Sequence, residues 1–87
     1  MEKQVTVLNK TGLHARPASM FVKLAARYRS DIYLIHGEKQ ANAKSIISVM
    51  TLAAGKGTVL TLRAEGPDEA EAVDALAALI ESKFGEE

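Results

Sequence analysis

The chain has 87 residues, of which 47% are hydrophobic and 25% charged, a composition typical of one small soluble domain. It contains no cysteine, which excludes disulfides and thiolate metal sites, and its net charge of zero argues against general binding of nucleic acids. The N-terminus lacks the apolar core of a signal peptide and no apolar stretch is long enough to span a membrane, so we expect a single cytoplasmic domain over residues 1–87 with no membrane insertion.

Alternating and helical hydrophobic periodicities divide the chain into seven elements. Gly37 suits a hairpin turn between two of the strands. Proline is common at the first position of a helix, so Pro17 and Pro67 are expected to begin two of the helices. The acidic residues Asp68 and Glu69 suit the positive end of the last helix. In chain order we expect a strand over 4–8, a helix from Pro17 to Tyr28 or Arg29, strands over 31–37 and 38–43, a helix from Ser45 to about Ala53, a strand over 58–64 and a helix beginning at Pro67.

The order of these elements, βαββαβα, predicts an α+β fold in two layers. Each helix has one apolar face, which must be covered by one face of a sheet. We therefore expect a four-stranded, mostly antiparallel sheet with three helices on one face. The pattern does not determine the order of the strands. The buried side of the last helix is expected to hold Val73, Leu76, Ala77, Ile80 and Phe84.

The segment "TGLHARPAS", residues 11–19, gives the first helix an unusual beginning. A proline disfavours helical backbone in the residue before it, so the N-cap is expected to be Arg16. Ser, Thr, Asp or Asn would accept hydrogen bonds there, whereas arginine only donates and adds positive charge to the positive end of the helix dipole. An uncapped, cationic helix start is suited to an anion that arrives from outside.

His14 lies two residues before Arg16, and a neutral imidazole nitrogen is a competent nucleophile near neutral pH. A phosphoryl group on His14 would meet the backbone N–H groups at the helix start and the Arg16 side chain. Gly12 would let the preceding loop turn tightly. The alternative is that His14 is an ordinary loop histidine and Arg16 a solvated surface charge, and these residues alone leave both interpretations open.

The side of the first helix that faces away from the core is basic. Helical spacing places Arg16, Met20, Lys23 and Arg27 in one stripe, within a half of the chain, residues 1–44, that has eight Lys or Arg and three Asp or Glu. A solvated helix face more often mixes both signs of charge. A methionine in a basic stripe indicates docking to an acidic, partly apolar partner, although a merely basic helix also fits the pattern.

The second helix, by contrast, has more apolar residues than one face can bury. Ser45 is a good N-cap for this helix. The apolar residues span most of its circumference, so some must face water, Ile47 most clearly. Together with Met20 they would form an exposed apolar patch.

Two segments resemble a known family. "TGLHARPAS" is similar to the active-site segment of HPr, the histidine-containing phosphocarrier family of the bacterial sugar phosphotransferase system. "NAKSIISVMTLAAGKG", residues 42–57, is similar to the second signature of that family, and the resemblance extends over essentially the whole chain. It implies an open-faced β-sandwich. Ile47 and Ser48 depart from the Met and Gly that Gram-positive members often have, which bears on the identity of regulatory partners.

The resemblance also implies a function. His14 would accept a phosphoryl group on Nδ1 from phosphorylated enzyme I and pass it to a histidine on the A domain of a sugar-specific enzyme II. The backbone N–H groups of Ala15 and Arg16, with the Arg16 side chain, would hold the phosphate. The chain would then be a stoichiometric carrier and not a turnover enzyme. The residues that match the docking surface of the family are Ile46, Ile47 and Met50.

Ser45 has a second possible role besides capping. It matches the serine that a dedicated ATP-dependent HPr kinase/phosphorylase modifies in HPr proteins of low-GC Gram-positive bacteria. The capping role alone would also explain a serine at this position. The resemblance thus implies a regulatory phosphorylation site that the local sequence does not require.

Two other functions are alternatives to the carrier role. A regulatory protein acting only through Ser45 would not need His14, and a phosphohistidine hydrolase would need a general base and a substrate pocket that the sequence does not reveal. Residues 53–58, "AAGKGT", lack the first glycine of a P-loop. His14 and His36 are far apart and have no cysteine partners, so we expect neither a metal site nor a bound cofactor.

Overall fold

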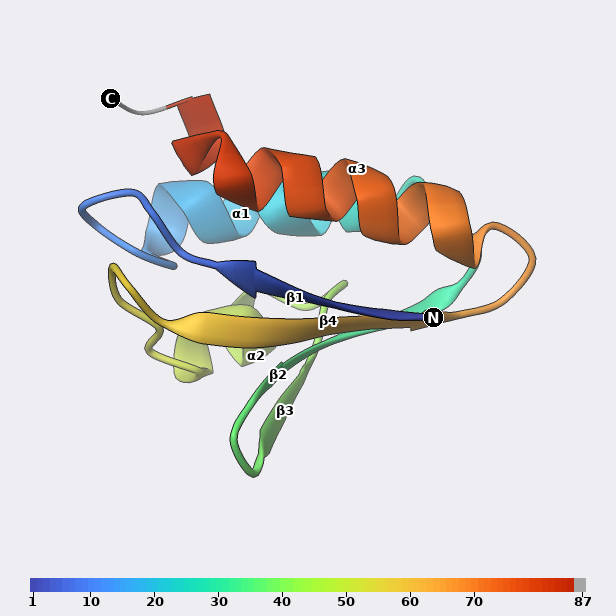
Figure 1. Cartoon of the computed structure of the whole chain (residues 1–87), viewed down its shortest axis with the longest axis horizontal. Helices are drawn as coiled ribbons and strands as arrows, with labels where there is room; N and C mark the ends of the chain where they lie inside the picture. Colours follow the sequence, from blue (N-terminus) through green and yellow to red (C-terminus); the bar gives the residue numbers. More distant parts are fainter. Residues whose placement is uncertain (86–87) are drawn as a thin grey trace.

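The computed structural model describes residues 1–85 and contains the seven expected elements in the expected order. In Figure 1, α1 and α3 lie side by side above the sheet. The elements are β1 (Glu2–Thr6), α1 (Ala15–Ala25), β2 (Asp31–His36), β3 (Lys39–Asn42), α2 (Ile46–Thr51), β4 (Val59–Glu65), α3 (Glu69–Glu81) and a short 3-10 helix, η1 (Lys83–Gly85).

The four strands form one sheet in the order β1-β4-β2-β3, and all three neighbouring pairs are antiparallel. The register places Leu62 of β4 beside Leu34 of β2, and Leu34 beside Ala41 of β3. All three are buried, because residues paired directly across neighbouring strands project from the same face of the sheet. The predicted α+β fold is therefore confirmed. The structure also gives the strand order, which the sequence left open.

One hydrophobic core fills the space between the sheet and the helices. Each of the three helices contributes buried side chains to it, and Phe21 of α1 and Phe84 are among its largest members. The predicted buried side of α3 is confirmed. The remaining helical members are Ala18, Val22, Ala25, Val49, Ala72, Val73, Leu76, Ala77 and Ile80.

The predicted start of the first helix is wrong by two residues. Helix α1 begins at Ala15 and its N-cap is His14, not Arg16. The first residues of a helix have no intrahelical acceptor for their N–H groups, so proline is tolerated at the third position as well as at the first. The helix also ends sooner than expected, at Ala25, because i to i+3 bonds such as Tyr28 N–H to the Ala25 carbonyl tighten the last turn.

The start of α3 also differs from the prediction. The N-cap is Asp68 and the first helical residue is Glu69, so Pro67 lies just outside the helix. Phe84 is buried as expected, but it belongs to η1 and not to α3. Its positive φ of 56° breaks the helical path after the end of α3.

Loops gather at the two ends of the sheet. At the left of Figure 1 the β1–α1 loop, in blue, lies near the α2–β4 loop, in yellow-green, and a hydrogen bond from Leu13 N–H to the Ala54 carbonyl joins them. The N-terminus and the β4–α3 turn are at the opposite end. His14 belongs to the first of these ends and the N-terminal amine to the second.

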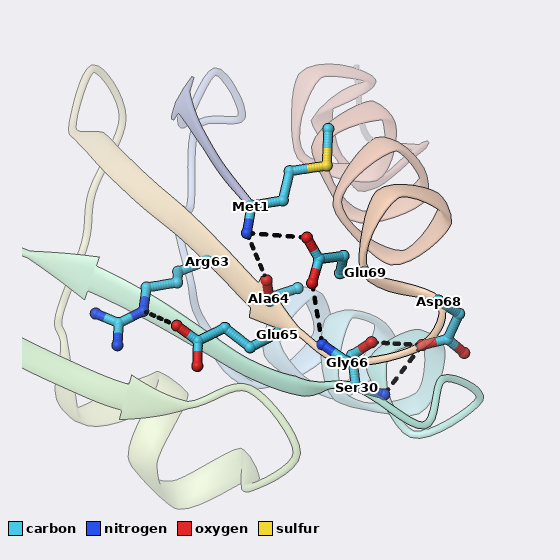
Figure 2. A network of polar contacts seen from close by, with 8 residues as sticks. All are labelled: Met1, Ser30, Arg63, Ala64, Glu65, Gly66, Asp68 and Glu69. Atoms are coloured by element: carbon cyan, nitrogen blue, oxygen red, sulfur yellow. Dashed lines mark hydrogen bonds and ion pairs between the residues drawn. The ribbon is translucent and has the colours of Figure 1, made fainter.

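A polar network closes the end that is remote from His14 (Figure 2). The Met1 ammonium donates to the Ala64 carbonyl at 2.8 Å and lies 3.4 Å from the Glu69 carboxylate, which also accepts from Gly66 N–H. The Asp68 carboxylate accepts from the Ser30 hydroxyl at 2.6 Å and from two backbone N–H groups. These contacts fasten the start of α3 to the N-terminus and to the segment before β2.

The same contacts lower the pKa of both carboxyl groups below their ordinary values. The Ser30 hydroxyl is the largest cause for Asp68, followed by the Arg29 backbone N–H. The Gly66 backbone N–H is the largest cause for Glu69, followed by the N-terminal ammonium. Each donor favours the ionised carboxylate over the protonated acid.

Candidate functional site

His14 stands at the N-cap of α1 with its side chain exposed. Its backbone is extended, with φ −84° and ψ −179°, and its carbonyl accepts the first bond of the helix from Ala18 N–H at 2.9 Å. Its side chain makes no capping hydrogen bond, and the first turn has no acidic residue. The N–H groups of Ala15 and Arg16, the first two helical residues, are therefore left for an external acceptor.

Arg16 brings a free positive charge to the same helix end. Its side chain is exposed, and the ion pairs found within residues 1–85 join Met1 with Glu69 and Arg63 with Glu65. The helix dipole has its positive end at this turn. Because the first turn also lacks an acidic residue, the field near His14 favours an anion.

A close contact between two loops fixes the backbone just before His14. Gly12 has a φ of +65°, and a Cβ atom there would lie 2.3 Å from the Ala54 carbonyl oxygen and 2.7 Å from the Gly55 Cα. The following residue, Leu13, is buried and donates its N–H to the same carbonyl at 2.9 Å. The predicted need for glycine is confirmed, and its cause is both a left-handed turn and a contact that excludes a side chain.

Asn9 closes the turn that leads to His14, and sequence reasoning missed it. The Asn9 side chain is fully buried; its Nδ2 donates to the Gly12 carbonyl at 2.9 Å and to the Thr11 hydroxyl at 3.2 Å. Gly12 N–H in turn donates to the Asn9 carbonyl at 3.2 Å. The sequence pattern that could have revealed this role is an asparagine three residues before a glycine, because both residues are common in turns. Ala54 was missed as well, because its contact comes from a distant part of the chain.

The predicted docking residues lie on α1, in the turn after it and on α2, and the two helices contact one another. Arg27, expected within the first helix, lies in that turn, because α1 ends at Ala25. Lys23 and Arg27 are exposed, and Met20 is half-buried against the core. On α2 only Val49 is buried, whereas Ile47 is 79% exposed. The exposed apolar side chains that were expected on this helix are thus present, and Ile46 and Met50 join Ile47 in water.

Ser45 occupies the N-cap of α2, as predicted. Its hydroxyl accepts the Ser48 N–H at 3.3 Å, and its residue is half-buried. The adjacent Lys44 donates from its ammonium to the Tyr28 carbonyl, 2.8 Å away, just after the end of α1. The start of α2 is thereby connected to the end of α1.

A groove of about 360 Å³ lies between β3 and α2, and none of its lining residues belongs to the His14 loop. Within residues 1–85, no cluster of histidine and acidic side chains could hold a metal ion. No helix in this part of the chain has the length and apolar character needed to cross a membrane. His14 is thus presented on an open surface at a helix end.

The family model described as "PTS HPr component phosphorylation site" matches residues 1–82. The chain belongs to the HPr family. This family consists of phosphocarriers of the phosphotransferase system. The four-stranded antiparallel sheet with three helices that this chain forms is the fold of solved HPr structures.

HPr proteins of several bacteria are similar to this chain over nearly its full length. The phosphocarrier protein HPr of Cupriavidus necator is 46% identical over 86 residues, which cover 99% of this chain and 97% of that protein. The HPr-like protein Crh of Halalkalibacterium halodurans is 52% identical over 83 residues, or 95% and 99% of the two chains. An HPr crystal structure from Thermoanaerobacter tengcongensis superposes with a TM-score of 0.96 at 52% identity, covering 100% of this chain and 98% of that one.

Proposed function

We propose that this HPr-family chain accepts a phosphoryl group on His14 from phosphorylated enzyme I and delivers it to the A domain of a sugar-specific enzyme II in the cytoplasm. The observation on which this rests is an exposed histidine at an uncapped helix start, beside an arginine that no acidic side chain of residues 1–85 neutralises. The donor and acceptor proteins can both reach a group that stands on an open surface.

The reaction is a transfer between nitrogen atoms. The Nδ1 lone pair of His14 forms a bond to phosphorus while the bond between phosphorus and the donor imidazole breaks, and the second transfer reverses these roles with the acceptor. The Ala15 and Arg16 N–H groups and the Arg16 guanidinium hold the phosphoryl oxygens. The chain is regenerated once its phosphoryl group has left, so it is a carrier and not a turnover enzyme.

The surface of α1 and α2 is the proposed docking site for both proteins. Lys23 and Arg27 would attract an acidic partner, and the exposed apolar side chains would pack against it. This division of labour suits a carrier that must bind two proteins in turn and leave each of them quickly. The apolar members are Met20, Ile46, Ile47 and Met50.

Ser45 is the proposed site of regulation by an HPr kinase/phosphorylase. A phosphate on its hydroxyl would lie at the start of the exposed α2, where it would repel an acidic partner and disturb apolar contacts. Two relatives support a regulatory role of this kind, the Crh proteins of Halalkalibacterium halodurans and Bacillus subtilis; a solved structure of the latter is described as a catabolite repression protein.

The carrier function is tested with enzyme I and radiolabelled phosphoenolpyruvate. We expect an acid-labile label on the wild type and on Ser45→Ala, and none on His14→Ala, because phosphohistidine is the labile species. Label that persists in His14→Ala contradicts the proposal. Steady release of free phosphate would instead indicate a hydrolase, and a wild type without label would leave only the regulatory function.

The regulatory site is tested with an HPr kinase and ATP. Mass spectrometry should find one phosphate on the wild type and on Ser48→Ala, whose hydroxyl is three residues away, and none on Ser45→Ala. A wild type that stays unmodified removes the regulatory proposal and leaves the carrier function intact.

A further inference from the structure

The peptide unit between Gly12 and Leu13, one residue before His14, is held at both of its polar atoms. Its carbonyl oxygen accepts from Asn9 Nδ2 at 2.9 Å. Its N–H donates to the Ala54 carbonyl at 2.9 Å. A peptide unit is planar, so two bonds to its opposite sides restrain its rotation about the chain.

These bonds lie in a buried setting, which strengthens them. Asn9 is 0% exposed and Leu13 is 4% exposed. Away from water a hydrogen bond is electrostatically stronger, and removing its donor leaves the acceptor without compensation. Gly12 N–H also donates to the Asn9 carbonyl, so the asparagine binds both polar groups of the glycine.

We infer that Asn9 is a positioning residue for phosphoryl transfer, which acts by fixing the peptide plane that aims His14 at the first N–H groups of α1. The inference rests on the proposed transfer through His14. Asn9 is buried, and its side-chain amide donates hydrogen bonds within the turn that it closes. Its side chain therefore influences the reaction through the backbone that carries the imidazole.

The need for such a device follows from the position of His14. The residue is the N-cap, outside the regular hydrogen bonding of the helix, and its side chain has no capping bond. A nucleophile must approach phosphorus along a narrow direction while the phosphoryl oxygens meet their donors. A loop that can rotate at Gly12 would disperse the imidazole over orientations that miss these donors.

The test compares wild type, Asn9→Ala and Asn9→Asp as substrates of enzyme I and phosphoenolpyruvate. Asparagine and aspartate have nearly the same shape, but the carboxylate cannot donate to the Gly12 carbonyl. We expect kcat to fall about tenfold or more in both variants. KM should stay within about twofold, because the exposed side chains of α1 and α2 are untouched.

Ser30→Ala is the matched control for loss of a buried polar contact. Ser30 is 1% exposed and its hydroxyl binds Asp68 at the other end of the sheet. This variant should lose stability and retain the wild-type kcat. If Ser30→Ala slows transfer as much as Asn9→Ala at equal stability, or if both Asn9 variants retain the wild-type kcat, the positioning role is overturned.

A measurement on the wild type keeps the inference testable if the Asn9 variants do not fold. The Asn9 side-chain amide protons and the Leu13 backbone amide should exchange slowly with solvent by NMR, whereas those of the exposed Gln40 side chain should exchange quickly. Fast exchange at Asn9 overturns the inference. A wild type that takes up no label overturns the proposed function and the positioning role together, whereas a labelled wild type with unaffected Asn9 variants overturns the positioning role alone.

Discussion

Two glycines with nearly the same backbone differ in what surrounds them. Gly12 has a φ of +65° and Gly37 a φ of +62°. Nothing lies within 4 Å of the position where a Cβ atom of Gly37 would be, whereas the same atom at Gly12 would overlap the Ala54 carbonyl. The pair therefore separates the energy of a left-handed residue from the energy of close contact between loops.

Gly37→Ala should lower the free energy of unfolding by about 1 kcal/mol, the ordinary penalty for alanine in this conformation. Gly12→Ala should lower it by about 1 to 3 kcal/mol more, because backbone atoms must shift to admit the methyl group. Urea unfolding of both variants measures the difference. Equal losses would contradict the loop contact described at Gly12.

Residue types also explain why the site could be predicted only in part. His14, Arg16 and Gly12 are recognisable because each breaks a local rule of helix capping or backbone conformation. Asn9 and Ala54 are not, because their roles arise from contacts with Gly12 and Leu13 that a local pattern does not encode. The start of α1 was misplaced because a proline is compatible with more than one position in a first turn.

At the scale of the element, α2 is too short to be stable by itself. It has six residues, and one side-chain cap, the Ser45 hydroxyl, begins it. Isolated helices of this length do not persist in water, so the cap and the packing of Val49 must maintain it.

Ser45→Ala should destabilise the protein by about 1 kcal/mol, because the first turn of α2 loses its acceptor. Ser45→Asp should lose less, since a carboxylate caps as well as a hydroxyl. Thermal or urea unfolding of the two variants gives the comparison. An Ala variant as stable as the Asp variant would show that the 3.3 Å contact contributes nothing.

The basic surface of α1 and of the turn that follows it leads to a prediction about the KM for docking. Arg27→Glu should raise the KM of the chain as a substrate of enzyme I by about 3- to 10-fold, since it reverses a charge on the proposed docking surface. The effect should shrink at high ionic strength. Lys3→Glu makes the same change in net charge on β1, and should alter KM by less than about twofold. Equal effects of the two changes would mean that only net charge matters.

At the scale of the whole molecule, the order of elements and the buried faces follow from periodicity, whereas the strand order does not. Strand β4 pairs with β1 and β2, which lie far from it in the chain. Such pairing depends on long-range packing. The network at the N-terminal end was likewise hidden, since Asp68 and Glu69 suit a helix start in any fold. Only the tertiary structure brings Ser30 and Met1 to them.

This network predicts how stability depends on pH. Folding lowers the pKa of Asp68 from 3.8 and that of Glu69 from 4.5, so both stabilise the folded state fully above those values. The contribution is lost as the pH falls through the lowered values, because the protonated acids no longer favour the folded state.

Asp68→Asn should therefore be less stable than the wild type near pH 7, and the difference should shrink as the pH is lowered towards about 2. Asp74→Asn, an exposed change on the same helix, is the control and should lower stability near pH 7 by less than Asp68→Asn does. Chemical denaturation at a series of pH values makes the measurement. A constant difference for Asp68→Asn would argue that the carboxylate is not engaged with Ser30.

The exposure of Ile47 has a consequence for anyone who engineers this protein. Screens that reward solubility or shelf life replace water-facing isoleucines with charged residues first. At position 47, where 79% of the residue is exposed, such a replacement would leave the core intact and remove an apolar side chain from the proposed docking surface. A variant made more soluble in this way would bind the proposed partner proteins less well.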